Sequence, residues 1–276
     1  MKRLLGTLVL LLAATVVFAA GGKEESDVRT GADTMGDGSL QQILDNGELV
    51  LGLDDSFPPM GFRDEDGNIV GFDIDLAKEV TDRLGVELRL QPIDWDSKIL
   101  DLNSGDIDVI WNGLTITPER EEKIDFSKPY LANRQIVIVQ ADSGIDTKAD
   151  LADKAVGIQL GSSAEDAVNS DPETLETFAS LNKYQDNVQA LLDLEVGRID
   201  AVVVDEILGR YYISQKPGVF TVASDFFAAE EYGIGFRQGE SAFIEAVDGA
   251  LDEMVADGTA AEISEKWFGE DVLLPR

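Results

Sequence analysis

Residues 100–112, LDLNSGDIDVIWN, are matched in order by residues 192–205, LDLEVGRIDAVVVD. In each segment a helical stretch ends at a glycine and an apolar strand follows. A polar residue stands directly after each strand, Asn112 in one case and Asp205 in the other. Strands and helices alternate on both sides of both segments, which is typical of mainly parallel sheets covered by helices. The repeat therefore predicts two similar α/β lobes.

The composition excludes several kinds of function. The chain has 276 residues, with 22 Lys+Arg, 54 Asp+Glu, no His and no Cys, and a formal net charge of -32. Without His or Cys there can be no Ser-His-Asp or Cys-His catalysis, no disulfide and no Cys-ligated zinc. The negative charge argues against nucleic acid or anionic lipid as a partner, because the phosphates would be repelled. Carboxylate, Lys or Tyr chemistry and pure binding remain.

The N-terminal segment predicts export. Residues 1–20 have two basic residues, an apolar run at 4–17 and small residues up to Ala20, as in a secretory signal peptide. The run is shorter than the about 20 residues that span a bilayer. No Cys follows it, so we expect no lipid anchor and a periplasmic location. Residues 21–38 are small and polar and predict a flexible linker, with Ser39 as the N-cap of the first helix.

The predicted binding site lies at the ends of the strands. Ligands of open α/β sheets bind beyond the carboxyl ends of the strands, and two facing lobes would place those ends around one cleft. The residues that follow the strands contain aromatic side chains, small residues with free backbone amides and an isolated acid, and they are 54–57, Trp95, 112–115, 161–163 and Asp205. Together with Arg120 they fit a free amino acid, which needs an arginine and backbone N–H groups for its carboxylate and a carboxylate for its ammonium.

Four motifs carry a family resemblance, and they are GFDIDL at 71–76, LTITPER at 114–120, DFSKPY at 125–130 and KWFG at 266–269. They resemble those of the polar-amino-acid solute-binding proteins of bacterial ABC importers, and the resemblance covers about 39–269. It implies the two-lobed type II periplasmic fold, in which each lobe is a mainly parallel sheet flanked by helices. It also implies a monomer that needs no cofactor, closes over an amino acid and delivers it to a membrane permease.

The same resemblance implies lobe boundaries. Lobe one would comprise about 39–131 plus 232–276, and lobe two about 132–231. Hinge strands would cross near 130–134 and 230–233.

The resemblance also implies roles at the backbone end of the ligand. Arg120 would bind the ligand carboxylate, helped by the hydroxyl and N–H of Thr115 and by the N–H of Ser163. Asp205 would bind the α-ammonium, with the carbonyl of Gly113 as a second acceptor.

The side-chain end favours a cationic ligand. Phe57 and Trp95 would enclose the ligand side chain, with Asp54 at its polar end. Cation–π attraction would contribute about 0.5–2 kcal/mol, and a charge-assisted hydrogen bond to Asp54 about 1.5–3 kcal/mol. Arginine or lysine is therefore the first expectation. Glutamine or cystine comes next, because Asn112 and Gln159 could bind an amide or a second polar head. Ser162 is a further candidate for the cleft.

Several of these residues have structural alternatives. Arg120 could be a surface arginine paired with Glu119 or Glu121. Asp73 and Asp75 are expected to be an N-cap and a surface acid. Trp111 and Trp267 are expected to be structural.

The alternative function is that of a periplasmic enzyme on the same fold, of the cyclohexadienyl-dehydratase kind. Asp54, Asp55 or Glu206 could act as its general acid. A dehydratase would recognise a ring rather than an α-amino group, so the acid at Asp205 argues against this alternative. We expect no enzyme.

Overall fold

The structure, a computed structural model, describes residues 36–276 as one folded unit. The predicted signal peptide and the predicted linker up to residue 35 lie outside the described residues. In the described part, no helix is long and apolar enough to cross a membrane. Asp37, near the end of the predicted linker, accepts hydrogen bonds from Ser241 Oγ at 2.7 Å and Ala242 N at 2.9 Å. Ser39 is not an N-cap, since it lies inside the first helix and its hydroxyl accepts from Phe243 N at 3.1 Å.

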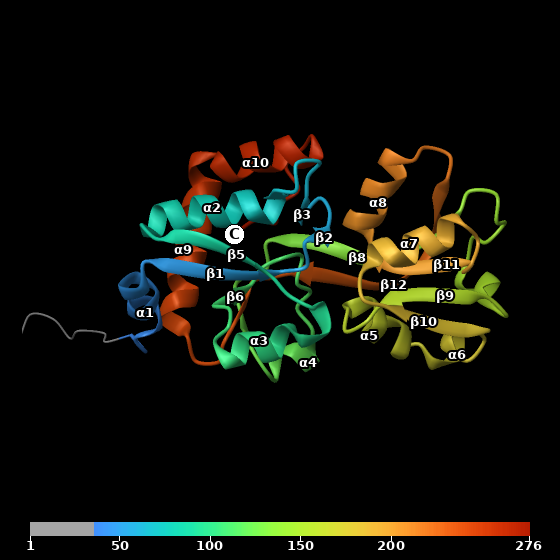
Figure 1. The fold of residues 1–276 in the computed structure, drawn as a ribbon, viewed down its shortest axis with the longest axis horizontal. Coiled ribbons are helices and arrows are strands. Elements are labelled where there is room, and N and C mark those ends of the chain that lie inside the picture. The colour runs from blue at the N-terminus through green and yellow to red at the C-terminus, as the bar shows by residue number, and fades with distance from the viewer. Residues whose placement is uncertain (1–35) are drawn as a thin grey trace, which may run out of the picture. The chain divides into compact units, whose positions relative to one another are not determined.

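Within the described residues, the sheet of lobe one has five strands in the order β5-β1-β6-β13-β7. Their bounds are β1 (Glu48–Leu53), β5 (Glu87–Pro92), β6 (Val109–Ile110), β7 (Asp125–Phe126) and β13 (Gly235–Phe236). Strand β1 is parallel to β5 and β6, while β13 is antiparallel to β6 and β7, so all strands but β13 run the same way. The helices of this lobe come from both ends of the chain (Figure 1) and are α1 (Ser39–Asn46), α2 (Phe72–Leu84), α3 (Lys98–Ser104), α4 (Pro118–Glu121), α9 (Ser241–Asp257) and α10 (Thr259–Phe268).

Two short pieces complete lobe one. A small sheet has the order β2-β3-β4, with β2 (Ser56–Phe57), β3 (Gly61–Arg63) and β4 (Ile69–Val70). A single 3₁₀ turn, η1 (Trp95–Ser97), leads directly into α3.

The sheet of lobe two repeats the plan in the order β10-β9-β11-β8-β12. Its strands are β8 (Leu131–Gln140), β9 (Ala155–Gln159), β10 (Ser180–Tyr184), β11 (Ala201–Asp205) and β12 (Phe220–Tyr232), and its helices are α5 (Ser163–Asn169), α6 (Pro172–Leu175), α7 (Asn187–Glu195), α8 (Glu206–Gln215) and the 3₁₀ turn η2 (Lys148–Leu151). Strand β9 is parallel to β10 and β11, and β8 is antiparallel to β11 and β12. Because β5-β1-β6 and β10-β9-β11 have the same arrangement, the predicted internal repeat is confirmed.

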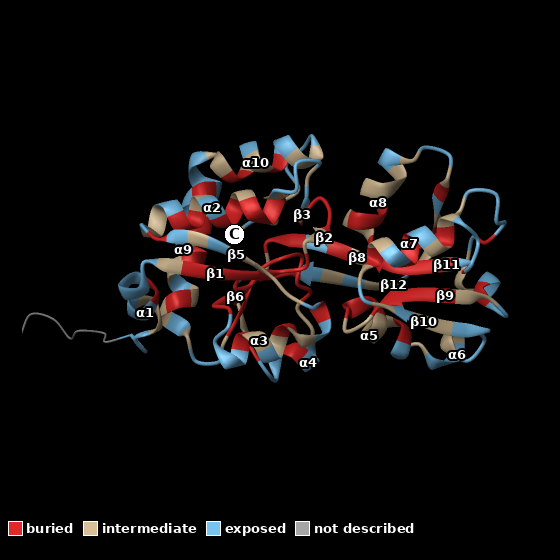
Figure 2. Ribbon diagram, viewed as in Figure 1, coloured by how far each residue is buried: buried red, intermediate tan, exposed pale blue. Residues whose placement is uncertain are grey.

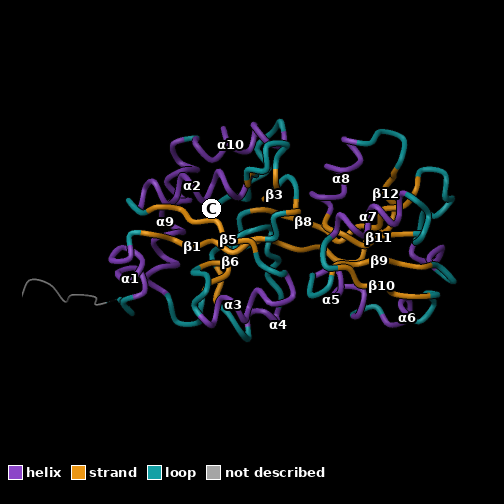
Figure 3. Tube along the Cα trace, viewed as in Figure 1, coloured by secondary structure: helices purple, strands orange, loops and turns teal. Residues whose placement is uncertain are grey.

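The long strands β8 and β12 connect the lobes. They form an antiparallel pair from Leu131↔Tyr232 to Gln140↔Phe220, and both are drawn as long strands in Figure 3. The chain enters the second sheet at the start of β8 and leaves it at the end of β12. Both crossings fall within the segments 130–134 and 230–233, where hinge strands are predicted.

The central strands form the core. All five residues of β11 are buried, as are all residues of β1 except the first. Figure 2 shows these strands as buried, with exposed surfaces on the helices around them. Continuous apolar strands of this kind are expected where helices cover both faces of a sheet.

Asp73 is not the N-cap that the sequence predicts. Helix α2 follows Gly71, and Asp73 lies inside its first turn, fully buried. The Asp73 carboxylate accepts hydrogen bonds from Gly113 N at 2.7 Å and Tyr130 Oη at 2.9 Å, and burial raises its pKa to about 7. Asp73 therefore fixes the loop after β6 through its hydrogen bond with Gly113.

Asp75, Trp111 and Trp267 have the structural roles that the sequence predicts. Asp75 is partly exposed and accepts hydrogen bonds from Lys266 Nζ at 2.6 Å and Trp267 Nε1 at 2.7 Å, so it ties α2 to α10. Trp111 is fully buried, with its ring centroid 6.4 Å from that of Tyr130. Both tryptophans therefore contribute to packing.

Candidate functional site

A small cavity of about 10 Å³ lies between the two lobes. Ten described residues line it, all of them predicted from the sequence: Asp54, Phe57, Trp95, Asn112, Gly113, Arg120, Gln159, Ser162, Ser163 and Asp205. All of them are buried, and the exposed fraction is 8% for Asp54 and 5% for Arg120 and Asp205. Thr115, the remaining candidate, does not line the cavity, but its hydroxyl oxygen lies 3.0 Å from that of Ser163.

The strand ends position these side chains. In lobe one, Asp54 directly follows β1 and Asn112 lies just beyond β6. In lobe two, Gln159 ends β9, Asp205 ends β11 and Ser163 begins α5. Because the carboxyl ends of parallel strands lie at one edge of a sheet, residues far apart in sequence meet in one place.

The cleft is closed in this structure. Several hydrogen bonds cross it from lobe to lobe, among them Gln159 Nε2 to Asp54 Oδ2 at 2.7 Å, Lys98 Nζ to Gly161 O at 2.8 Å and Arg120 Nη2 to Gly161 O at 3.3 Å.

Gly161 permits a close approach of the lobes. Its φ is 69°, and a Cβ added there would lie 2.9 Å from Asp96 Cα of lobe one. Its carbonyl accepts from the ammonium of Lys98, which also donates to Trp95 O at 2.9 Å. Burial, and then the nearby Arg120, lower the pKa of Lys98 well below its usual range.

The local sequence around Arg120 fixes the position of this residue at the start of a short helix. Thr117 caps α4 by accepting from Arg120 N at 3.2 Å, and Pro118 occupies the first helical position, as predicted. The buried guanidinium donates to Thr115 O at 2.8 Å and to Gly161 O at 3.3 Å. Burial lowers the pKa of Arg120.

The surface-pair alternative for Arg120 is wrong. Glu119 pairs with Lys123 at 2.7 Å, and no described carboxylate lies within 4.0 Å of the Arg120 guanidinium. A buried cation without an anionic partner is costly unless a ligand supplies the anion.

Asp205 presents a carboxylate to the same cavity. It accepts from Asn133 Nδ2 and from Tyr232 Oη, each at 2.7 Å. Burial, and then the charge of Glu230, raise its pKa to about 7. No described cation pairs with it.

Asp54 is a second buried carboxylate in the cavity. Its oxygens accept from Ser56 N at 2.9 Å, Ser56 Oγ at 2.6 Å and Gln159 Nε2 at 2.7 Å, all neutral donors. Burial raises its pKa. The basic residue closest in sequence, Arg63, pairs with the neighbouring Asp55 at 2.6 Å instead.

The two aromatic rings of the cavity, Phe57 and Trp95, each lie against a specific neighbour. Gly113 has φ 59°, and a Cβ there would lie 2.9 Å from the ring of Phe57, so a larger residue would displace that ring. The ammonium of Lys98 lies 4.9 Å from the centroid of Trp95, which therefore already contacts one cation.

Comparison with known proteins identifies the family of this chain. A family model described as bacterial extracellular solute-binding proteins, family 3, matches residues 49–270. The chain belongs to this family. The L-cystine-binding protein TcyJ of Escherichia coli (strain K12) is 34% identical over 270 residues, which are 97% of each chain. The arginine-binding extracellular protein ArtP of Bacillus subtilis (strain 168) is 32% identical over 266 residues, which are 95% of this chain and 97% of the relative.

A solved structure is similar as well. The ABC uptake transporter substrate binding protein from Streptococcus pneumoniae, with bound histidine, has a TM-score of 0.83 at 37% identity and covers 85% of this chain and 98% of its own. The predicted family and the two-lobed type II periplasmic fold are thereby confirmed.

Sequence reasoning missed a set of residues around the site of this family 3 protein. These residues do not line the cavity; they form hydrogen bonds with residues in or next to it. They are Asp73, Lys98, Asn133, Gln135, Asn187, Glu230 and Tyr232. The motif YGIGF at 232–236 is recognisable in the sequence and could have pointed to Tyr232. In the structure, Tyr232 pairs with Thr115 of the LTITPER motif.

Proposed function

We propose that this protein captures L-arginine or L-lysine in the cleft between the lobes, among the residues that line this cavity, and delivers it to an ABC importer. The observation that carries the proposal is the charge of the cavity. Two carboxylates, Asp54 and Asp205, and one guanidinium, Arg120, line it, and none of them has an ion-pair partner among the described residues. A dibasic amino acid supplies two cations and one anion, so every buried charge in the cavity gains an opposite charge.

The roles follow from the position of each charge. Arg120 binds the ligand carboxylate, for which its planar fork is suited. Asp205 binds the α-ammonium together with the carbonyl of Gly113. Asp54 binds the distal cation, and the aromatic rings of Phe57 and Trp95 enclose the aliphatic part of the side chain.

Other amino acids leave a charge unbalanced. Glutamine has no distal cation, so Asp54 would keep only neutral partners. Cystine has a second ammonium for Asp54 but also a second carboxylate, and among the described residues no second cation lines the cavity. Lys98 is close, yet its ammonium donates to Trp95 O and Gly161 O. The relatives named above are described with cystine, arginine and histidine, so likeness alone does not select the ligand.

The mechanism is closure of the cleft around the ligand. In the open form the ligand first meets Arg120 on lobe one, and closure brings Asp205 and Ser163 of lobe two onto its ammonium and carboxylate. Exclusion of water strengthens each of these electrostatic contacts. A membrane permease then recognises the closed form.

The setting follows from the family. We infer that the protein acts in the periplasm, as a monomer, and that it is a carrier and not an enzyme. The raised pKa of Asp54 would suit a general acid. A bound ligand cation reverses that shift, because an opposite charge favours the ionised carboxylate.

A thermal-shift screen tests the proposal. The protein is unfolded and refolded to remove carried-over ligand, and is then melted with each proteinogenic amino acid, ornithine, citrulline and cystine. A ligand at about 100 times its Kd adds about 2.7 kcal/mol to the free energy of unfolding. Stabilisation by arginine or lysine alone supports the proposal. Stabilisation only by glutamine or cystine contradicts the charge argument, and stabilisation by none contradicts amino acid binding and directs attention to the dehydratase reaction.

A further inference from the structure

Strand β12 contributes a carboxylate next to the cavity that the sequence does not single out. Glu230 Oε2 accepts hydrogen bonds from four described side chains: Thr115 Oγ1 at 2.9 Å, Gln135 Nε2 at 3.0 Å, Asn133 Nδ2 at 3.2 Å and Ser163 Oγ at 3.2 Å. One oxygen atom is thus the common acceptor for two hydroxyls and two amides.

These donors come from both sides of the cleft. Thr115 belongs to lobe one, while Ser163 begins helix α5 of lobe two. Their hydroxyl oxygens lie 3.0 Å from each other and 2.9 and 3.2 Å from Glu230 Oε2, and their two hydrogens fill two of these three contacts at a time. Opening of the cleft separates these hydroxyls, so Glu230 keeps both contacts only in the closed form.

The carboxylate also fixes the direction of the hydroxyl protons. A hydroxyl has one hydrogen and two lone pairs, and an ionised carboxylate only accepts. Thr115 therefore donates its proton to Glu230 and offers lone pairs elsewhere. Ser163 Oγ already accepts from Gln135 Nε2 at 3.1 Å. A hydroxyl held in this way is an acceptor for an ammonium and is not available as a donor to a carboxylate.

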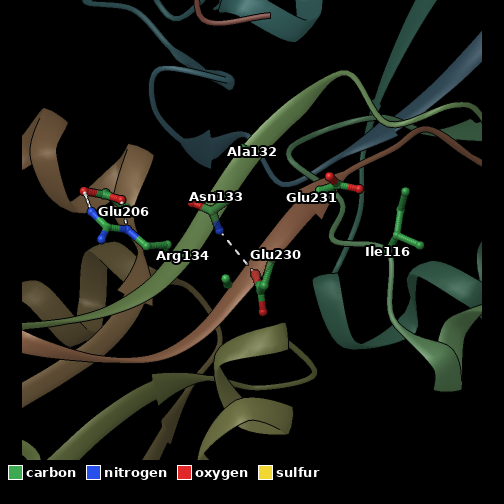
Figure 4. Close-up of a pocket in the computed structure, with 8 residues that line it drawn as sticks. Ile116, Ala132, Asn133, Arg134, Glu206, Glu230 and Glu231 are labelled. Atoms are coloured by element: carbon green, nitrogen blue, oxygen red, sulfur yellow. Dashed lines mark hydrogen bonds and ion pairs between the residues drawn. The ribbon is translucent and has the colours of Figure 1, made fainter. Parts of the chain in front are cut away.

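Glu230 is linked to the acid of the ammonium site. The same nitrogen, Asn133 Nδ2, donates to Glu230 Oε2 and to Asp205 Oδ1. Figure 4 shows Asn133 and Glu230 facing each other across the paired strands β8 and β12. Asn133 and Glu230 line a surface groove that is separate from the cavity. Arg134 lines this groove too, but it is bound to Glu206 at 2.6 and 2.7 Å and so does not neutralise Glu230.

We propose that Glu230 is a positioning residue for the ligand ammonium. It orients the hydroxyl of Ser163, which lines the cavity, and the adjoining hydroxyl of Thr115 as acceptors, and it stabilises the closed form in which they meet. This rests on the proposed function in one respect, namely that the ligand carries an α-ammonium. It also reassigns the Thr115 hydroxyl from the ligand carboxylate to the ammonium.

The chain offers a matched control. Glu231 is the next residue on β12, lines the same groove and is exposed, and it has no side-chain hydrogen bond to the described residues (Figure 4). Glu231→Ala removes the same charge from the same strand without touching the hydroxyls.

The first experiment compares two ligands by isothermal titration calorimetry. L-arginine and desamino-arginine, in which hydrogen replaces the α-ammonium, are titrated into the wild type, Glu230→Ala, Glu230→Gln and Glu231→Ala. Glu230→Ala is expected to weaken arginine binding by about 10- to 100-fold and to weaken desamino-arginine binding by a clearly smaller factor, because that ligand loses only the stabilisation of the closed form. Glu230→Gln, whose amide oxygen can still accept, recovers most of the arginine affinity, and Glu231→Ala changes neither. Equal losses for both ligands would assign Glu230 a merely structural role and overturn the proposal.

The second experiment needs no ligand. The chain has no Cys, so Glu121→Cys and Glu173→Cys, both exposed, one in each lobe, give a uniquely labelled pair for single-molecule energy transfer. Glu230→Ala is expected to shift the ligand-free protein to a longer inter-label distance, and Glu231→Ala is not. An unchanged distance would overturn the closure part of the proposal. Should the wild type bind no amino acid, the proposed function fails while this experiment still decides the role of Glu230 in closure.

Discussion

The side-chain amide of Gln159 donates to the carboxylate of Asp54 at 2.7 Å, and this hydrogen bond joins the two lobes across the cavity. Asn187 Nδ2 donates to Gln159 Oε1 at 2.9 Å, which fixes the amide with its nitrogen toward Asp54. Asp54 therefore has a neutral donor at the point where a cationic ligand would form a stronger, charge-assisted bond. In the proposed function, the specificity of the site depends on this carboxylate.

Removing the charge of Asp54 is expected to change specificity. Asp54→Asn should weaken arginine and lysine binding by about 10- to 150-fold, because one charge-assisted hydrogen bond is lost. Glutamine binding should change by less than about 3-fold, since it does not use the charge. Calorimetric titration measures both. Asp55→Asn is the control, because Asp55 pairs with Arg63 outside the cavity; undiminished arginine binding by Asp54→Asn would refute the assignment.

Arg120 is expected to serve every ligand alike. Arg120→Lys keeps the charge but loses the planar fork, so the affinities for arginine and lysine should both fall by about 100-fold. The loss is the same for both because the α-carboxylate is common to them. Arg63→Lys, on an exposed pair, should leave the affinity unchanged. A loss confined to one ligand would show that Arg120 contacts the side chain instead.

Affinity is expected to rise with pH. Burial and the charge of Glu230 raise the pKa of Asp205 to about 7, so in the ligand-free closed form the carboxylate is protonated below that pH. The ligand ammonium requires the ionised form, and binding at about pH 5.5 should be about 30-fold weaker than at about pH 8. For the same reason the ligand-free protein should lose stability as the pH rises toward about 7, because the folded state disfavours the charged carboxylate.

A variant separates Asp205 from other titrating groups. Asp73, behind the Gly113 loop, also has a pKa raised to about 7 by burial. In Asp205→Asn the remaining affinity should be weak and nearly independent of pH. A pH dependence that survives in this variant would assign the titration to Asp73 or another group.

Gly161 is expected to limit closure. Gly161→Ala places a Cβ 2.9 Å from Asp96 Cα and imposes a φ of 69° on alanine, so ligand should dissociate faster and bind about 10-fold or more weakly. Stopped-flow fluorescence measures the dissociation rate. Gly144→Ala is the matched control, because Gly144 has φ 72° and an added Cβ there meets nothing within 4 Å. Equal effects of both substitutions would indicate backbone strain without any role in closure.

The cavity could be predicted from sequence because of one geometric rule. Asn112 and Asp205 are recognisable as polar residues that directly follow apolar strands, and parallel strands bring such residues to one edge. Neither position depends on the exact pairing of distant strands.

Glu230 could not be predicted in this way. Its contacts depend on the register Glu230↔Asn133, which is reached only after two irregularities in the β8–β12 pairing, between Val222 and Phe226 and between Phe226 and Ala228. No local pattern specifies how many residues such irregularities insert.

Lys98 and Asp73 show a second limit. Lys98 has the appearance of an ordinary helix lysine, since its partner Gly161 O belongs to the other lobe. Asp73 has the right spacing for a cap, but the loop at Gly113 packs over it and supplies the hydrogen-bond donor. In both cases a tertiary contact outweighs the local preference.

The charge balance of the cavity is the central claim, and one titration tests it most directly. L-arginine and L-citrulline have nearly the same shape, but citrulline carries a neutral urea in place of the guanidinium. The ligand-stripped protein, titrated with each by calorimetry, should bind arginine at least about 10- to 100-fold more tightly, because only the guanidinium neutralises Asp54. Citrulline or glutamine binding as tightly as arginine would contradict the account.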